Sequence, residues 1–201
     1  MTSNRIVLAS SSPRRKQILE WAAVPFDVLV RETDERFDPA LDLHAAVADV
    51  ARRKAMAVWE EVEEGRIILA ADTIVALKDG VIGKPRSRED AIDMLTRLQG
   101  RTHQVITGVA LVKGRQEILF SDTTEVTFYP LTTRQITYYI DHYQPFDKAG
   151  SYAIQEWIGV TGIKKINGDF YNVMGLPVSR ILQEIRKLQY LLAEDGSMPF
   201  P

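Results

Sequence analysis

The fold of this 201-residue chain is decided at the stretch Ile6-Val7-Leu8-Ala9-Ser10-Ser11-Ser12-Pro13-Arg14-Arg15. The first four of these residues form a short apolar run, which is typical of a buried strand. Ser12 followed by Pro13 is a helix-start signal, because serine can cap a helix and proline suits its first position. The predicted helix continues to about Ala22. A strand, a turn and a helix in this order open many phosphate-binding α/β folds.

Two arginines occupy the first turn of this predicted helix, where the helix dipole favours acidic side chains. The unpaired N–H groups at a helix start can bind an anion. Arg14 and Arg15 lower helix stability there unless an anion lies between them and the helix end, and arginine is suited to bidentate phosphate contacts. The pair therefore indicates a phosphate site. The alternative is a capped helix with solvated arginines.

The rest of the chain mixes helical and strand periodicity. The predicted helices are residues 43–64, 87–100 and 133–143, and a last segment from Pro177 to about Leu192. The predicted strands are 26–30, 67–71, 105–112 and 118–128, with a hairpin around Asp79-Gly80. This pattern predicts an α/β fold that is mixed rather than strictly alternating. No linker is evident, so we expect one domain over residues 1–193 and a disordered tail over 194–201.

Lys54 interrupts the apolar face of the helix predicted from Leu43. At 100° per residue it falls near the middle of the stripe that Val47, Val50 and Val58 define. An unpaired buried ammonium is costly, so Lys54 is expected to meet a carboxylate or a bound anion. The alternative is a lysine whose head extends along the surface into water.

Asp72 follows the most hydrophobic run of the chain, Ile67 to Ala71. Functional carboxylates in α/β sheets often lie at the carboxyl end of a strand, where ligands bind. At such a position Asp72 could hold a divalent metal or deprotonate water. It could equally form a turn.

The composition narrows the function. A net charge of −2 offers no overall positive field, so no nucleic-acid polymer is expected as a partner. The absence of cysteine excludes disulfides, thiolate metal sites and a cysteine nucleophile. Any metal is therefore expected to be a hard ion held by oxygen, such as Mg²⁺ or Mn²⁺. No apolar run approaches the roughly 20 residues of a membrane span and no signal peptide is evident, so a cytoplasmic protein is expected.

Several segments together closely resemble the Maf family of nucleoside triphosphate pyrophosphatases. The resemblance runs from about residue 6 to 185, in matching order and spacing. It rests on the motifs Leu8 to Arg15, Ala51 to Ala55, Ala71 to Val75, Ile82 to Pro85, Gln104 to Gly108, Asp147 to Tyr152 with Ile154-Gln155, Ile166 to Gly168, and Asn172 to Pro177.

This resemblance implies an elongated mixed α/β sheet with flanking helices, a cleft between two lobes, and a homodimer. It implies hydrolysis of nucleoside triphosphates at the α-phosphate, with release of pyrophosphate and with Mg²⁺ or Mn²⁺ as cofactor. The family's catalytic aspartate, the proton acceptor, matches Asp72. Its phosphate and metal site matches Ser10, Arg15, Lys54 and Lys84 for phosphate, and Glu35 with Asp72 for metal.

The resemblance also bears on the base of the substrate. Within the family, the branch that prefers dTTP and UTP is marked by residues that match Arg14, Thr73 and Gln155. A glutamine amide complements the N–H and carbonyl edge of thymine or uracil. Trp157 and Thr161 to Ile163 depart from the family pattern beside this region. The alternatives are the same chemistry on 7-methyl-GTP or non-canonical purine triphosphates, and a nucleotide-binding regulator of cell division or septum formation.

Overall fold

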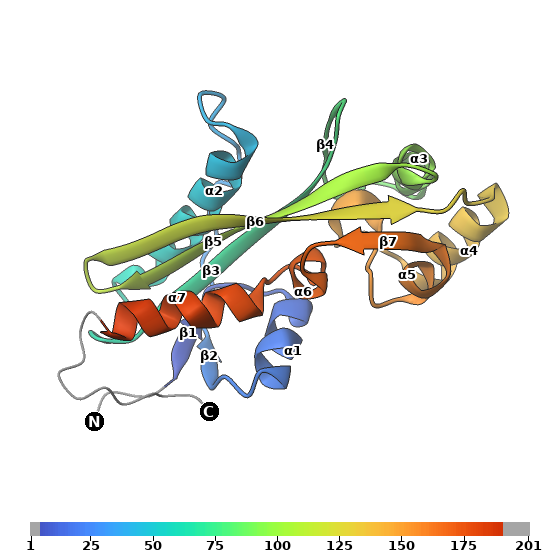
Figure 1. Cartoon of the computed structure of the whole chain (residues 1–201). Helices are drawn as coiled ribbons and strands as arrows, with labels where there is room; N and C mark the ends of the chain where they lie inside the picture. The colour runs from blue at the N-terminus through green and yellow to red at the C-terminus, as the bar shows by residue number, and fades with distance from the viewer. Residues whose placement is uncertain (1–4, 191–201) are drawn as a thin grey trace. The chain divides into compact units, whose positions relative to one another are not determined.

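The computed structural model describes residues 5–190 and contains a mixed α/β fold. A seven-stranded sheet has the order β2-β1-β3-β5-β6-β7, and β4 pairs with β3. Strand β1 runs parallel to β2 and β3, whereas β3 with β4 and β6 with β7 are antiparallel. The predicted mixed sheet with flanking helices is confirmed (Figure 1). None of the helices in the described part combines the length and hydropathy that crossing a membrane requires.

The bounds of the elements follow the chain. The strands are β1 (Ile6–Leu8), β2 (Phe26–Val28), β3 (Ile68–Leu77), β4 (Gly80–Ile82), β5 (Thr102–Lys113), β6 (Gln116–Phe128) and β7 (Ile163–Asn167). The helices are α1 (Pro13–Trp21), α2 (Leu43–Trp59), α3 (Arg88–Leu98), α4 (Thr133–Tyr143), α5 (Trp157–Gly162), α6 (Phe170–Met174) and α7 (Val178–Tyr190), with a 3₁₀ turn η1 (Ala149–Ser151).

The described residues divide into two compact units. The first contains residues 5–72, 107–122 and 175–190, and the second contains 73–106 and 123–174. Strands β3, β5 and β6 each contribute to both units. The cleft between lobes and the single domain over 1–193 stay predictions. The predicted tail, 194–201, lies outside the described residues, as does the predicted end of the last helix near Leu192.

In the first unit, helix α2 packs on one face of the sheet. Its residues Ala51, Ala55 and Val58 form a buried cluster with alternate residues of β1, β3 and β5. Helices α1 and α7 lie on the opposite side of these strands (Figure 1). Successive side chains of a strand point to opposite faces, and consecutive residues of β1 and of the first half of β3 are buried. These strands are therefore apolar on both faces.

Helix α2 ends earlier than its sequence predicts. It stops at Trp59 rather than near Glu64, and backbone bonds from Val62 to Trp59 and from Arg66 to Glu63 turn the chain instead. Carboxylates at 63–64 would lie at the negative end of the helix dipole, which disfavours them there. The Trp59 ring nitrogen also donates to the Gly114 carbonyl, which anchors the end of the helix.

Strand β3 is longer than predicted, and this moves Asp72. The sequence places a strand end at Ala71, but β3 continues through Asp72 and Thr73 to Leu77. Residues 74–77 are buried and 75–77 pair with β4, so the two half-buried polar residues interrupt the apolar run without ending the strand. Asp72 therefore lies in the middle of a strand, and its prediction as a strand-end or turn aspartate is wrong.

The second unit contains helices α3, α4 and α5, with β4 and β7. Helix α4 has the predicted bounds, and Thr132 with Gln135 forms its capping box. Helix α3 begins after Ser87, whose hydroxyl accepts from Asp90 N at 3.1 Å. The Asp90 carboxylate accepts from the Arg86 amide rather than from Ser87, so only one of the two bonds of a capping box is formed.

Candidate active site

Three charged side chains of the first unit meet at one point. The ammonium of Lys54 on α2 lies 2.7 Å from Asp72 Oδ1 on β3 and 2.7 Å from Glu35 Oε1 in the segment between β2 and α2. The side chains of Lys54 and Asp72 are 15% and 16% exposed, whereas Glu35 is 54% exposed. The prediction that Lys54 meets a carboxylate is confirmed, and the solvated alternative is wrong. The cluster is a cation held between two carboxylates, of which Asp72 is mostly buried and Glu35 is exposed.

The position of Lys54 follows from how closely α2 approaches the sheet. A side-chain carbon on Gly108 of β5 would lie 2.3 Å from the backbone of Val47, so only glycine allows this contact. The buried alanines of α2 likewise keep the helix near the strands. Because α2 lies this close to the sheet, the Lys54 ammonium reaches Asp72 of β3. A small-residue contact is thus what places the charge beside Asp72.

The start of α1 holds a buried guanidinium. Arg15 donates through Nε to the Gly175 carbonyl at 2.8 Å and through a terminal nitrogen to Ser10 Oγ at 3.0 Å. Ser10 and Arg15 are both buried, at 7% and 8% exposure. Ser10 Oγ also accepts from the Ser12 amide at 3.3 Å, while the Ser12 side chain makes no capping bond, contrary to prediction. These bonds fix the Arg15 fork before any ligand binds.

Arg15 interacts electrostatically with Asp72 and Glu35, the two carboxylates that hold Lys54. Burial lowers the pKa of the Arg15 guanidinium to about 10; the Asp72 and Glu35 carboxylates oppose this effect, and the neighbouring Arg14 adds to it. At neutral pH Arg15 therefore stays protonated. A buried arginine that two carboxylates stabilise is a preorganised cation, which suits a bidentate oxyanion contact.

The donor set bears on a metal ion. Asp72 and Glu35 each direct a carboxylate oxygen at the Lys54 ammonium. Such oxygens suit Mg²⁺ or Mn²⁺ when the ammonium gives way to the ion. Within residues 5–190, no group of three or more acidic, histidine or cysteine side chains forms a complete metal cage. Mg²⁺ normally binds through one or two carboxylates, with water and substrate phosphates as its other ligands. The two carboxylates fit that pattern.

The remaining predicted residues are divided between the units. Arg14 is half-buried in the first unit. Thr73 is half-buried, and Lys84 and Gln155 are exposed, all in the second unit. The loop of Lys84 is tied to that of Gln155, because Gly150 N donates to Gly83 O at 3.0 Å. The structure therefore groups Ser10, Arg15, Glu35, Lys54 and Asp72 in one unit, and Lys84 with Gln155 in the other.

Sequence analysis gave no role to the side chains that contact Glu156, the neighbour of Gln155. The hydroxyl of Tyr139 hydrogen-bonds to Glu156, and Lys148 Nζ lies 2.7 Å from Asp147 and 3.6 Å from Glu156. In the sequence, Tyr139 is one aromatic residue of the helix predicted over 133–143, and such a position indicates packing and no chemistry. Only the tertiary structure shows that Tyr139 is fully buried and bonds to Ala153 and Glu156, on either side of the motif Ile154-Gln155.

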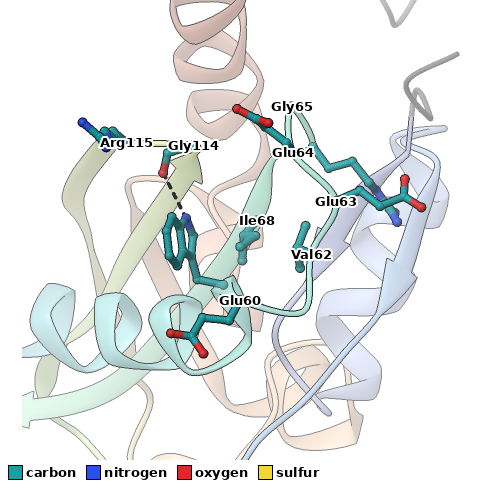
Figure 2. A pocket seen from close by; sticks show the side chains of 10 residues that line it. Glu60, Val62, Glu63, Glu64, Gly65, Ile68, Gly114 and Arg115 are labelled. Atoms are coloured by element: carbon teal, nitrogen blue, oxygen red, sulfur yellow. Dashed lines mark hydrogen bonds between the residues drawn. The ribbon is translucent and has the colours of Figure 1, made fainter.

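A cavity of about 540 Å³ lies elsewhere in the first unit, at the end of α2. Figure 2 shows the side chains of Val62 and Ile68, which line it. Three glutamates and two arginines also line it, so it lacks the positive field that a triphosphate needs. None of the predicted site residues borders this cavity.

The mixed sheet and the charged cluster define an α/β protein in which a lysine is held between two carboxylates. The family model of Maf-like protein matches residues 5–188. The chain belongs to this family.

Curated relatives support the same assignment. A dTTP/UTP pyrophosphatase of Cytophaga hutchinsonii is 48% identical over 91% of this chain and 84% of that protein. A dTTP/UTP pyrophosphatase of Bacillus cereus is 43% identical over 91% of this chain and 95% of that protein. A solved nucleoside-triphosphatase, a dITP/XTP pyrophosphatase of Mycobacterium abscessus, aligns with TM-score 0.42 and 14% identity over 94% of this chain and 97% of that chain. That likeness is too low to bear on function.

Proposed function

We propose that this chain hydrolyses dTTP and UTP to the nucleoside monophosphate and pyrophosphate. The names of its relatives and its membership of the Maf-like family support the reaction. The observation that carries the proposal is the Lys54 ammonium at 2.7 Å from both Asp72 and Glu35. Such a cluster can exchange its internal ion pairs for contacts to a phosphate and a metal ion.

Asp72 is the general base in this proposal. Lys54 occupies Oδ1, and no hydrogen bond among the described residues involves Oδ2, so this oxygen can accept a proton from water. The water oxygen attacks the α-phosphorus, and the bond from that phosphorus to the bridging oxygen of the β-phosphate breaks. Pyrophosphate leaves with the electron pair, and the proton of the water passes to Asp72. Nucleoside monophosphate is the other product.

The cations hold the triphosphate. Arg15 is fixed by Gly175 and Ser10, so its fork loses little freedom when it binds a phosphate. The Ser10 hydroxyl can donate a hydrogen bond to the same phosphate, and Lys54 and Lys84 contribute positive charges. Each charge-assisted hydrogen bond contributes about 1.5–3 kcal/mol. A divalent ion bound by Asp72 and Glu35 would neutralise charge on the phosphates.

The base is recognised by Gln155, with Thr73 and Arg14 as further specificity residues. The exposed amide of Gln155 can donate to a carbonyl and accept from the N–H of uracil or thymine. A site built on such a pair rejects bases that leave it unpaired, by up to ~10⁴-fold in favourable cases. We include in the same proposal the homodimer, the cytoplasmic location, the single domain over 1–193 and the cleft.

The experiment is pyrophosphate release from a panel of nucleoside triphosphates with Mg²⁺ or Mn²⁺, for the wild type and Asp72→Asn. We expect dTTP and UTP to be preferred, and the variant to lose at least ~100-fold in kcat while still binding nucleotide. A preference for purines or 7-methyl-GTP would keep the mechanism and overturn the roles of Thr73 and Gln155. No release from any nucleotide would favour a nucleotide-binding regulator, and equal release by the variant would overturn Asp72 as base.

A further inference from the structure

Gln155, which contacts the nucleobase in the proposed function, lies in a tight turn. Residues 153–156 are closed by a hydrogen bond from Glu156 N to Ala153 O at 3.1 Å. Ala153 and Ile154 are buried, at 5% and 4% exposure, whereas Gln155 is exposed. The turn therefore presents Gln155 to solvent directly after two buried residues. The direction of its amide depends on what holds the two ends of the turn.

One buried hydroxyl holds both ends. Tyr139 of α4 is fully buried, and its phenol oxygen accepts a hydrogen bond from Ala153 N at 3.1 Å. The same hydroxyl donates to Glu156 Oε2. The first bond fixes the residue two before Gln155, and the second fixes the residue after it. A hydroxyl that donates once and accepts once is thereby used on a single four-residue turn.

The other side of the turn is closed by α5. A side-chain carbon on Gly159 would lie 1.7 Å from the Ile154 carbonyl oxygen, so the helix backbone rests directly on the turn. Gly159 N also donates to Glu156 O at 2.9 Å. The turn thus cannot relax toward α5. On the side of α4, the Tyr139 hydroxyl bonds to Ala153 and Glu156, so contacts from both helices hold the turn.

We propose that the Tyr139 hydroxyl is a positioning residue for base selection, because it sets the orientation of Gln155 through Ala153 and Glu156. This inference rests on the proposed function. Tyr139 touches no substrate in it. It acts by removing alternative directions of the Gln155 amide, which makes the hydrogen-bonded pair with uracil or thymine selective.

The main test is Tyr139→Phe, which removes one oxygen and keeps the buried ring. We expect KM for UTP to rise about 10-fold, the effect of one lost hydrogen bond, with kcat within about 2-fold of wild type. The preference for UTP over ITP should fall by a similar factor. In the double variant with Gln155→Ala, the second change should add little, because both act on one contact.

Tyr138→Phe is the matched control. Tyr138 precedes Tyr139 on the same helix, is 42% exposed, and contacts His142 and Trp157 through its ring, which the variant keeps. It should retain both the wild-type KM and the selectivity. A structural effect of Tyr139 alone would lower Tm and leave the UTP to ITP ratio unchanged, and this result would overturn the inference.

A second variant decides the matter if Tyr139→Phe does not fold. Glu156→Ala removes the acceptor of the Tyr139 hydroxyl, and Glu156 makes no side-chain capping bond to α5 that would be lost with it. It also removes the 3.6 Å contact to Lys148 Nζ, for which Lys148→Gln is the control. Glu156→Ala should reduce the UTP to ITP ratio in the same direction; an unchanged ratio would overturn the inference.

The failure of the inference can be told apart from failure of the proposed function. If wild type prefers UTP and Gln155→Ala loses this preference while Tyr139→Phe and Glu156→Ala keep it, only the inference fails. If wild type shows no pyrimidine preference, both fail. Amide exchange at Ala153 needs no substrate, and should be about 10-fold faster in Tyr139→Phe, because its acceptor is removed.

Discussion

Replacing Gly108 by alanine perturbs the contact that seats α2 on the sheet. The added carbon would lie 2.3 Å from the Val47 carbonyl group and 2.4 Å from the Ala48 nitrogen. An ordinary contact of this kind is at least about 3.4 Å, so the helix or the strand must shift by about 1 Å. The neighbouring atoms are backbone, which cannot be relieved by a rotamer change.

The magnitude follows from that shift. Overpacking of this kind costs about 1–3 kcal/mol, which for a chain of this length lowers Tm by roughly 2–12 °C. Lys54 lies two turns further along the same helix, and its ammonium is 2.7 Å from Asp72. A 1 Å movement takes this pair out of hydrogen-bond range and should reduce kcat/KM for UTP by at least about 10-fold.

The assays are thermal unfolding and pyrophosphate release with UTP, with Gly83→Ala as the control for stability. A side-chain carbon at Gly83 meets no atom within 4 Å, so its Tm should stay close to that of wild type. Wild-type Tm and wild-type activity in Gly108→Ala would refute the argument that the close approach of α2 places Lys54. A lowered Tm with unchanged activity would refute only the link from the helix to Asp72.

Two further predictions concern the buried side chains of Arg15 and His103. Arg15→Lys keeps the positive charge but loses the fork that bonds Gly175 and Ser10, so KM for UTP should rise about 10-fold or more, measured by initial rates; an unchanged KM would contradict the role of the fork. Burial lowers the pKa of His103 from 6.5 to about 4. The unfolded chain then binds more protons at this site between these values, so about 3 kcal/mol of stability should be lost as pH falls from 6.5 to 4. His103→Gln should show a shallower decline of unfolding free energy over this window, and an equal slope would exclude His103 as its source.

Much of the fold and part of the site follow from local sequence patterns. The bounds of α4, the hairpin of β3 with β4 and the start of α1 depend on capping residues, proline and turn glycines, whose effects extend only a few residues. Lys54 is predicted to need an anionic partner because helical periodicity alone puts it on the apolar face. Such inferences need no knowledge of the rest of the chain.

The identities of the partners were decided by the tertiary structure. Glu35 lies in a loop with several carboxylates, and only the packing of α2 selects it as the second partner of Lys54. Arg15 hydrogen-bonds to Gly175, which is 160 residues away in the sequence. Tyr139 hydrogen-bonds to Glu156, which is 17 residues away in the sequence. Strand β3 continues through Asp72 because neighbouring strands satisfy its backbone. Contacts between distant residues depend on how whole elements pack, and local propensity carries no record of that packing.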